Sequence, residues 1–298
     1  MNKPLQLDYV DGAYARDYRT LKPSVVPHWL AVVGIAAALA AALYCSFVDH
    51  SLPDLAAWSS TLWLVVALAS ALLITPRVFT VGFLISLLPF LIAWRVAAMN
   101  DARVLMWVAS IAFIPLLLQF VDMIRTDWQR NRDQPGAWLG TLLWQATLVR
   151  MYFGLNELCH STEKLFAGLG SFHTLVHGFQ GFGLGGAAAL FVIVGGLTEL
   201  ASAISVGLGL FARLGAAVSL VYFLVATVGF GGEWARGYAW ASAGGGGWEY
   251  VMMLLIVFGS VLLTGAGKFS LDGWLLQRGL LPKLLVPLAT NAQGVKPQ

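Results

Sequence analysis

The sequence is poor in charge and in cysteine. Only 11% of its 298 residues are Asp, Glu, Lys or Arg, whereas soluble proteins average about 25%, and 58% are apolar. This composition excludes an ordinary soluble protein and predicts a polytopic membrane protein. Its net charge of +3 is typical of basic loops beside a membrane and does not indicate nucleic-acid binding. Cys45 and Cys159 form no CxxC pair, so the sequence contains no dithiol redox motif.

Apolar segments recur along the chain, and each is close to the roughly 20 residues that cross a bilayer as a helix. They predict an all-α membrane protein with about eight transmembrane helices in two four-helix bundles. We expect an N-terminal tail and four helices in residues 1–134. Four more helices and a C-terminal interfacial helix are expected in residues 135–298. The predicted spans are 28–48, 56–75, 78–99, 104–124, 138–159, 184–211, 214–232 and 248–267.

The basic residues are distributed unevenly over the predicted loops. Most lysines and arginines fall on the side of the N-terminus, and such an excess marks the cytoplasmic face. We therefore expect a multi-pass protein of the bacterial inner membrane with both termini in the cytoplasm. Loops 160–183 and 231–247 would then lie on the outer side.

A few ionisable side chains lie inside the predicted spans, where they are costly and usually have a partner or a function. Arg150 and Glu157 are two helical turns apart and share one face with the neighbouring Asn156. Glu199 lies among small residues that let helices approach closely, and Glu249 begins the last span. These charges either hold the bundle together or line a polar pocket. In the second case the glutamates transfer protons, and Arg150 and Asn156 bind a quinone or an anion.

Three of the five histidines lie close together in the predicted outer loop. His173 and His177 have i, i+4 spacing, and His160 precedes them. They are candidates for a metal or haem site. The alternative is an interfacial helix with histidines on its polar face.

The stretch GAGKFSLDGW at 265–274 combines glycine, lysine, serine and aspartate. It lacks the full G-x-x-x-x-G-K-[ST] pattern and the strand before it that a phosphate-binding loop requires. We therefore expect the end of a membrane helix, with Ser270 and Asp272 capping the interfacial helix that follows.

Short motifs in the second half occur in a fixed order. They run from about residue 145 to 275 and comprise Arg150, Lys164-Leu165-Phe166, Glu199, G-L-x-x-R at 209–213, Glu249 and G-x-G-x-x-S-L-D at 265–272. Together they resemble the DoxX/DoxD family of four-helix membrane proteins. Some relatives form the large subunit of thiosulfate:quinone oxidoreductase. The first four helices and the segment ELCHSTEK depart from the family pattern and indicate a specialised relative.

The resemblance implies the membrane subunit of a quinone-linked oxidoreductase that passes electrons from a periplasmic donor to membrane quinone. Its expected contacts are the lipid bilayer, quinone and a redox protein partner. Two alternatives stay open: a non-catalytic anchor for a periplasmic redox enzyme, and a small-anion transporter. The candidate residues are Glu199, Glu157 and Glu249 for catalysis, Arg150, Asn156 and Lys164 for quinone or anion binding, and His160, His173 and His177 for a metal.

Overall fold

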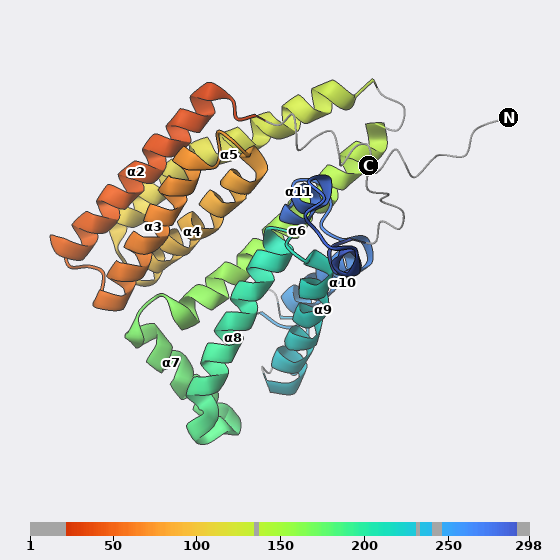
Figure 1. Ribbon diagram of the computed structural model, residues 1–298. Helices are drawn as coiled ribbons and strands as arrows, with labels where there is room; N and C mark the ends of the chain where they lie inside the picture. Colours follow the sequence, from red (N-terminus) through yellow and green to blue (C-terminus); the bar gives the residue numbers. More distant parts are fainter. Residues whose placement is uncertain (1–21, 134–136, 231–232, 240–245, 291–298) are drawn as a thin grey trace. The chain divides into compact units, whose positions relative to one another are not determined.

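The computed structural model describes residues 22–133, 137–230, 233–239 and 246–290 (Figure 1). Within these residues the chain is helical except for turns, short links and one isolated bridge between Gly265 and Thr290. The predicted all-α membrane fold is therefore confirmed. A helix satisfies every backbone hydrogen bond within its own segment, which is why apolar sequences of this length cross membranes as helices.

The described chain forms two compact units. The first comprises residues up to Trp144 together with Leu158–Leu197, and the second comprises Gln145–Glu157 and residues from Thr198 onward. The units are interleaved because two helices, α6 (Ala137–Leu165) and α8 (Ala188–Ser202), contribute to both. The predicted division after residue 134 stays a prediction.

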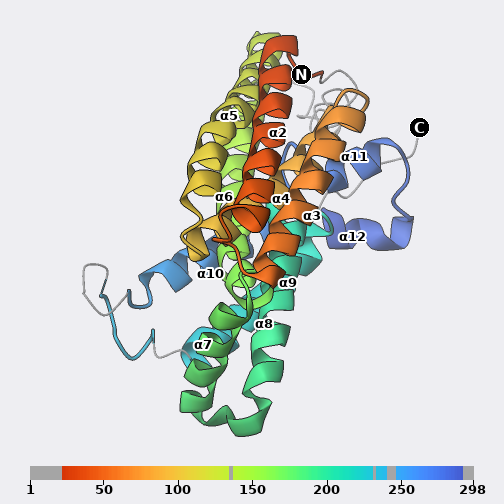
Figure 2. The ribbon, with the colours of Figure 1, turned by 90° about the vertical axis from the view of Figure 1, so that its left-hand side faces the viewer.

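The first unit contains a closed four-helix bundle. Helix α2 packs against α3 and α5, and α4 completes the ring by contacting α3 and α5. Figure 2 shows α2 between α5 and α3. Apolar side chains and alanines fill its core, among them Ile35, Leu64 and Phe90. The four helices are α2 (Val25–Phe47), α3 (Asp54–Leu73), α4 (Phe79–Met99) and α5 (Arg103–Asn131).

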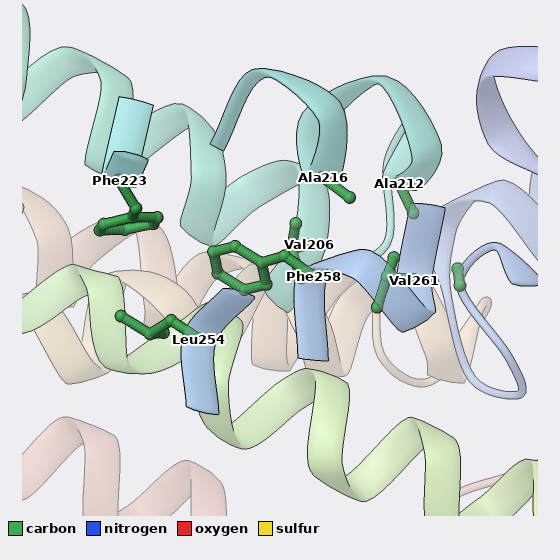
Figure 3. Packing of buried hydrophobic residues seen from close by; sticks show 8 residues of the cluster. Val206, Ala212, Ala216, Phe223, Leu254, Phe258 and Val261 are labelled. Carbon is green, nitrogen blue, oxygen red and sulfur yellow. The ribbon is translucent and has the colours of Figure 1, made fainter. Parts of the chain in front are cut away.

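The second unit is built around the middle of α6 and the helices that follow α8. Its hydrophobic core lies between α9 and α10, where the rings of Phe223 and Phe258 are 5.6 Å apart and Leu254 lies beside them (Figure 3). The elements are the π-helix η3 (Ala203–Gly207), α9 (Ala212–Phe223), the π-helix η4 (Leu224–Phe230), α10 (Glu249–Thr264), α11 (Leu271–Gln277), the 3-10 helix η5 (Lys283–Leu285) and α12 (Val286–Ala289).

Six helical segments of the described residues are long and apolar enough to cross a membrane. The two other predicted spans are also helical. Helix α6 has 29 residues but is less apolar, and α10 is apolar but has only 16 residues. The six segments are Val25–Phe47, Asp54–Leu73, Phe79–Met99, Arg103–Arg130, Leu169–Gly207 and Ala212–Gly229.

Two segments differ locally from the expectation. The predicted outer loop 160–183 is largely helical, because α6 continues to Leu165 and α7 occupies Leu169–Phe179. The predicted interfacial helix of the tail is divided into α11 and α12, because Gly279 has a positive φ of 62° and Pro282 follows it. Proline cannot donate the next helical hydrogen bond, and glycine readily adopts the left-handed region.

Helix α6 approaches η3 closely at one glycine pair. A Cβ atom added to Gly154 would lie 2.3 Å from the backbone nitrogen of Gly207. Real Cβ atoms do not approach a backbone nitrogen this closely, so the two segments can touch only while residue 154 is glycine.

We predict that Gly154→Ala lowers the thermal stability of the purified protein by about 5 °C, because the added methyl group forces α6 away from η3. The melting temperature is measured in detergent from the loss of the monodisperse peak. Gly259→Ala on α10 is the matched control, since no atom lies within 4 Å of its added Cβ. The control should be neutral or slightly stabilising; equal losses in both variants would contradict the prediction.

Candidate functional site

Arg150 is 1% exposed and is the largest fully buried side chain in the described residues. Its guanidinium binds backbone carbonyls of two segments. Nη1 donates to Val206 O and, at 2.7 Å, to Gly207 O, while Nη2 donates to Phe269 O at 3.1 Å. The planar guanidinium presents several donors in fixed directions, which suits it to bind several oxygens at once. Arg150 therefore ties α6 to η3 and to the segment after α10.

The local backbone makes these carbonyls available. Residues 203–207 form a π-helix, in which the regular i to i+4 pairing is interrupted. Phe269 has a positive φ of 54°, which is uncommon for a non-glycine residue. The chain thus presents carbonyl oxygens at two irregular positions, and a buried cation satisfies them.

The segments around Gly209 and Asp272 bind each other next to Arg150. Asp272 N donates to Gly209 O at 2.8 Å. In return, the Asp272 carboxylate accepts the amides of Phe211 at 2.7 Å and Ala212 at 2.9 Å, and so caps the beginning of α9. The two glycine-containing motifs, 209–213 and 265–272, therefore meet at one corner of the second unit.

The predicted capping of the tail helix is confirmed for Ser270, whose Oγ accepts the Gly273 amide at 3.0 Å. For Asp272 it is wrong, because this carboxylate caps α9 instead of α11. Asp272 is 1% exposed, and burial raises its pKa to about 6 even though the two amides and the Arg150 charge oppose the shift.

Glu199 and Tyr222 form a part-buried hydrogen bond inside the second unit. The Tyr222 hydroxyl donates to Glu199 Oε1 at 2.8 Å, and Glu199 is 5% exposed. One helical turn away, Ser219 and Ser202 are joined at 2.8 Å. The C-terminal end of α8 therefore runs antiparallel to α9, and the two polar pairs join the helices one turn apart. Glu199 faces the bundle interior, as its small neighbours indicate.

Glu157 belongs to the same polar region. Its side chain is fully buried and lies within electrostatic range of the Tyr222 hydroxyl. Arg150 and Glu157 both lie on α6 in the second unit. The structure thus joins Glu199 to Tyr222 and places Glu157 within electrostatic range of the same hydroxyl; the two glutamates are candidates from the sequence.

Asn156 and Glu249 hold the beginning of α10. Asn156 Nδ2 donates to the Tyr250 hydroxyl. Glu249 is buried, and its Oε1 accepts the backbone amide of Ala239 in the preceding link. These contacts fix the entry to α10, and the catalytic role expected for Glu249 stays a prediction.

The remaining candidates lie in the first unit. Lys164 Nζ donates to His160 O at 3.3 Å, and His177 Nδ1 lies 3.2 Å from Gln180 Oε1. His173 and His177 lie on α7 with exposed side chains. The described residues contain no group of three or more His, Cys, Asp or Glu side chains that could hold a metal ion. The metal or haem site stays a prediction from spacing.

Sequence reasoning missed Tyr222 and Tyr250, which complete the polar contacts of Glu199 and Asn156. A tyrosine in a membrane helix resembles an apolar or interfacial residue, so its partner is visible only once the helices are placed. The available signal is weak: Tyr222 and Ser219 are three residues apart, as are Glu199 and Ser202. This spacing puts each polar pair on one helical face.

Comparison with known families identifies the region that contains most of these residues. Residues 146–232 match the family model described as DoxX. This region is a DoxX domain. No curated protein and no solved structure matches the chain significantly, so the resemblance to thiosulfate:quinone oxidoreductase stays a prediction. Arg150, Glu157, Glu199 and Tyr222 lie inside the DoxX domain, whereas the Asp272 corner lies beyond its matched end.

We predict that Arg150→Met strongly destabilises the DoxX domain. The substitution leaves three backbone carbonyls without this donor, and each unsatisfied buried group costs about 1–3 kcal/mol. The melting temperature should fall well below that of the wild type, or the protein should fail to fold. Arg103→Met is the control, since Arg103 forms an exposed pair with Asp101 of the kind that contributes little. Equal stability of the two variants would disprove the structural role of Arg150.

A second prediction concerns the pH dependence of stability. The pKa of Asp272 is about 6 in the folded protein against a reference value of 3.8, so the folded state binds the proton more tightly. The stabilisation that protonated Asp272 gives the folded state is therefore lost as pH rises from about 4 to 6, and it no longer changes above about pH 7. The total decrease in the free energy of unfolding is up to about 3 kcal/mol. Melting temperatures between pH 4 and 7 should show a smaller decline with rising pH in Asp272→Asn than in the wild type. Parallel curves would exclude this titration.

Proposed function

We propose that the chain is the membrane component of a quinone-linked redox system, located in the bacterial inner membrane with both termini in the cytoplasm. In this proposal, the polar side chains of the DoxX domain bind the quinone head group, and a partner protein on the outer side supplies the electrons. The membrane location and the DoxX domain support the general assignment. The observation that carries the finer assignment is the part-buried Glu199–Tyr222 hydrogen bond with Glu157 nearby.

These residues suit a quinone for two physical reasons. The Tyr222 hydroxyl is a donor of the kind that a quinone carbonyl oxygen requires. The carboxyl groups of Glu199 and Glu157 are buried in the same unit, and carboxyl groups can give and take up protons in general acid–base chemistry. Tyr222 is partly exposed on α9, and its hydroxyl forms a part-buried hydrogen bond.

A bound quinone would supply the redox chemistry, since it accepts two electrons and two protons to become a quinol. The chain's own residues have three roles in this scheme. Tyr222 orients the head group through its hydroxyl. Glu199 holds a proton next to Tyr222, and Glu157 holds a second proton in the same region. Both electrons come from the partner protein.

Arg150 has a different part in this proposal. Its guanidinium already binds the carbonyls of Val206, Gly207 and Phe269, so we assign it to positioning. By holding η3 against α6, it positions the helix that carries Glu157 and the end of α8 that carries Glu199. Asn156 contributes similarly by fixing Tyr250 at the start of α10.

The partner protein would dock on the outer side. Helix α7 supports this idea, because its exposed His173 and His177 and its neighbouring apolar residues form an amphipathic surface helix. If the segment that begins with α7 starts at the outer membrane surface, a periplasmic donor would reach these histidines first.

A second candidate function is a non-catalytic anchor for a redox enzyme. It is favoured by the contacts of Arg150, Asp272 and Arg213, which all bind backbone atoms of the same unit. In that case the motif residues build the fold alone. Recovery of a redox enzyme with the purified chain, without quinone binding, would select this function.

The test compares quinone affinity in matched variants. We expect decylubiquinone to quench the tryptophan fluorescence of the purified protein, with an affinity that Tyr222→Phe and Glu199→Gln each weaken about tenfold through loss of a part-buried hydrogen bond. Tyr152→Phe is the control, since Tyr152 is 68% exposed on α6. Melting temperatures show whether each variant is folded. Unchanged affinity in folded Tyr222→Phe and Glu199→Gln would overturn the assignment.

A further inference from the structure

A small cavity lies in the first unit, and none of its lining residues belongs to the DoxX domain. It has a volume of about 90 Å³, which is room for roughly three water molecules or a phosphate group. Two apolar side chains form part of its wall. The polar lining consists of Lys22, Ser24, Gln119, Asp122, Thr126 and Arg130.

The cavity lies where α2 begins and α5 ends. Helix α2 begins at Val25, directly after Ser24. Helix α5 has 29 residues and is about 44 Å long, so it exceeds the hydrocarbon core of about 30 Å. Its last turns, which carry Thr126 and Arg130, therefore extend into the headgroup region.

The lining of the cavity carries both positive and negative side chains. Lys22 and Arg130 are exposed cations, and Asp122 is half-buried and accepts a hydrogen bond from Ser24 Oγ. Deeper in the bundle, buried Gln119 contacts His28 Nδ1 at 3.3 Å. Two cations can bind an anion, while the carboxylate would repel it unless the same ligand also brings a hydrogen-bond donor.

We propose that this cavity binds a phosphate group whose ligand also carries a hydroxyl or amine donor, as phospholipid headgroups such as phosphatidylglycerol do. Lys22 and Arg130 bind the phosphate oxygens, and Asp122 accepts the donor. Basic pockets between membrane helices bind lipid headgroups in this manner. A soluble phosphate ester such as glycerol 3-phosphate has the same chemistry, and the experiment distinguishes the two sources.

The experiment uses the full chain in detergent and follows the melting temperature as ligand is added. Phosphatidylglycerol, phosphatidylcholine and glycerol 3-phosphate are compared, because phosphatidylcholine has the phosphate but no donor. We expect stabilisation by phosphatidylglycerol at lower concentrations than by phosphatidylcholine. Glycerol 3-phosphate acting as well as phosphatidylglycerol would identify a soluble ligand of the same site.

The variants identify the residues. Lys22→Gln combined with Arg130→Gln should raise the half-saturating concentration at least about tenfold, as expected for two charge-assisted hydrogen bonds. Arg103→Gln combined with Lys283→Gln removes the same charge from exposed positions outside the cavity and should leave binding unchanged. Asp122→Asn should reduce the preference for phosphatidylglycerol over phosphatidylcholine.

Equal weakening in both double variants would mean a general charge effect and would overturn the proposal. Equal response of the wild type to phosphatidylglycerol and phosphatidylcholine would overturn the role of Asp122. Because every lining residue lies in the first unit and Tyr222 lies in the second, loss of this site leaves the proposed quinone binding by Tyr222 unaffected. The two proposals can therefore fail independently.

Discussion

The second unit depends on the contact of one buried guanidinium with three backbone carbonyls. A positive charge inside a membrane protein is costly unless several acceptors surround it. Val206, Gly207 and Phe269 provide them, the first two from the π-helix and the third from a residue in the left-handed region. The irregular backbone and the cation therefore require each other. A regular helix at 203–207 would leave Arg150 with fewer acceptors.

This requirement explains why the motifs of the second half are spaced as they are. The positive φ of Gly209, 72°, lets the chain turn between η3 and α9, and the Asp272 carboxylate caps the helix that follows. Arg213 then donates to Leu262 O at 2.7 Å and ties α9 to α10. The motif residues thus bind mainly backbone groups, and these hydrogen bonds position α6, α8 and α9. Glu157 and Glu199 depend on those positions.

The sequence was sufficient to predict the helices but not their irregularities. Apolar runs of 20 residues leave few alternatives to a helix in lipid, so the spans, the buried position of Glu199 and the Ser270 cap follow from local rules. The π-helices, the Glu199–Tyr222 pair and the second role of Asp272 do not. Each depends on a contact between residues 20 to 120 positions apart, which no local pattern encodes. The same distance explains why Tyr222 was missed while Glu199 was found: a buried charge is conspicuous alone, whereas a tyrosine needs its partner.

The Glu199–Tyr222 bond also limits how the proposed site can operate. A tyrosine hydroxyl has one proton and donates one strong hydrogen bond at a time. If it turns to the oxygen of a bound ligand, Glu199 loses this donor inside an apolar bundle. A buried polar group without a hydrogen-bond partner is costly, so Glu199 then requires another donor. Ligand binding would therefore be coupled to the hydrogen bonding of Glu199 through a single hydrogen atom, and Glu157 lies within electrostatic range of the same hydroxyl.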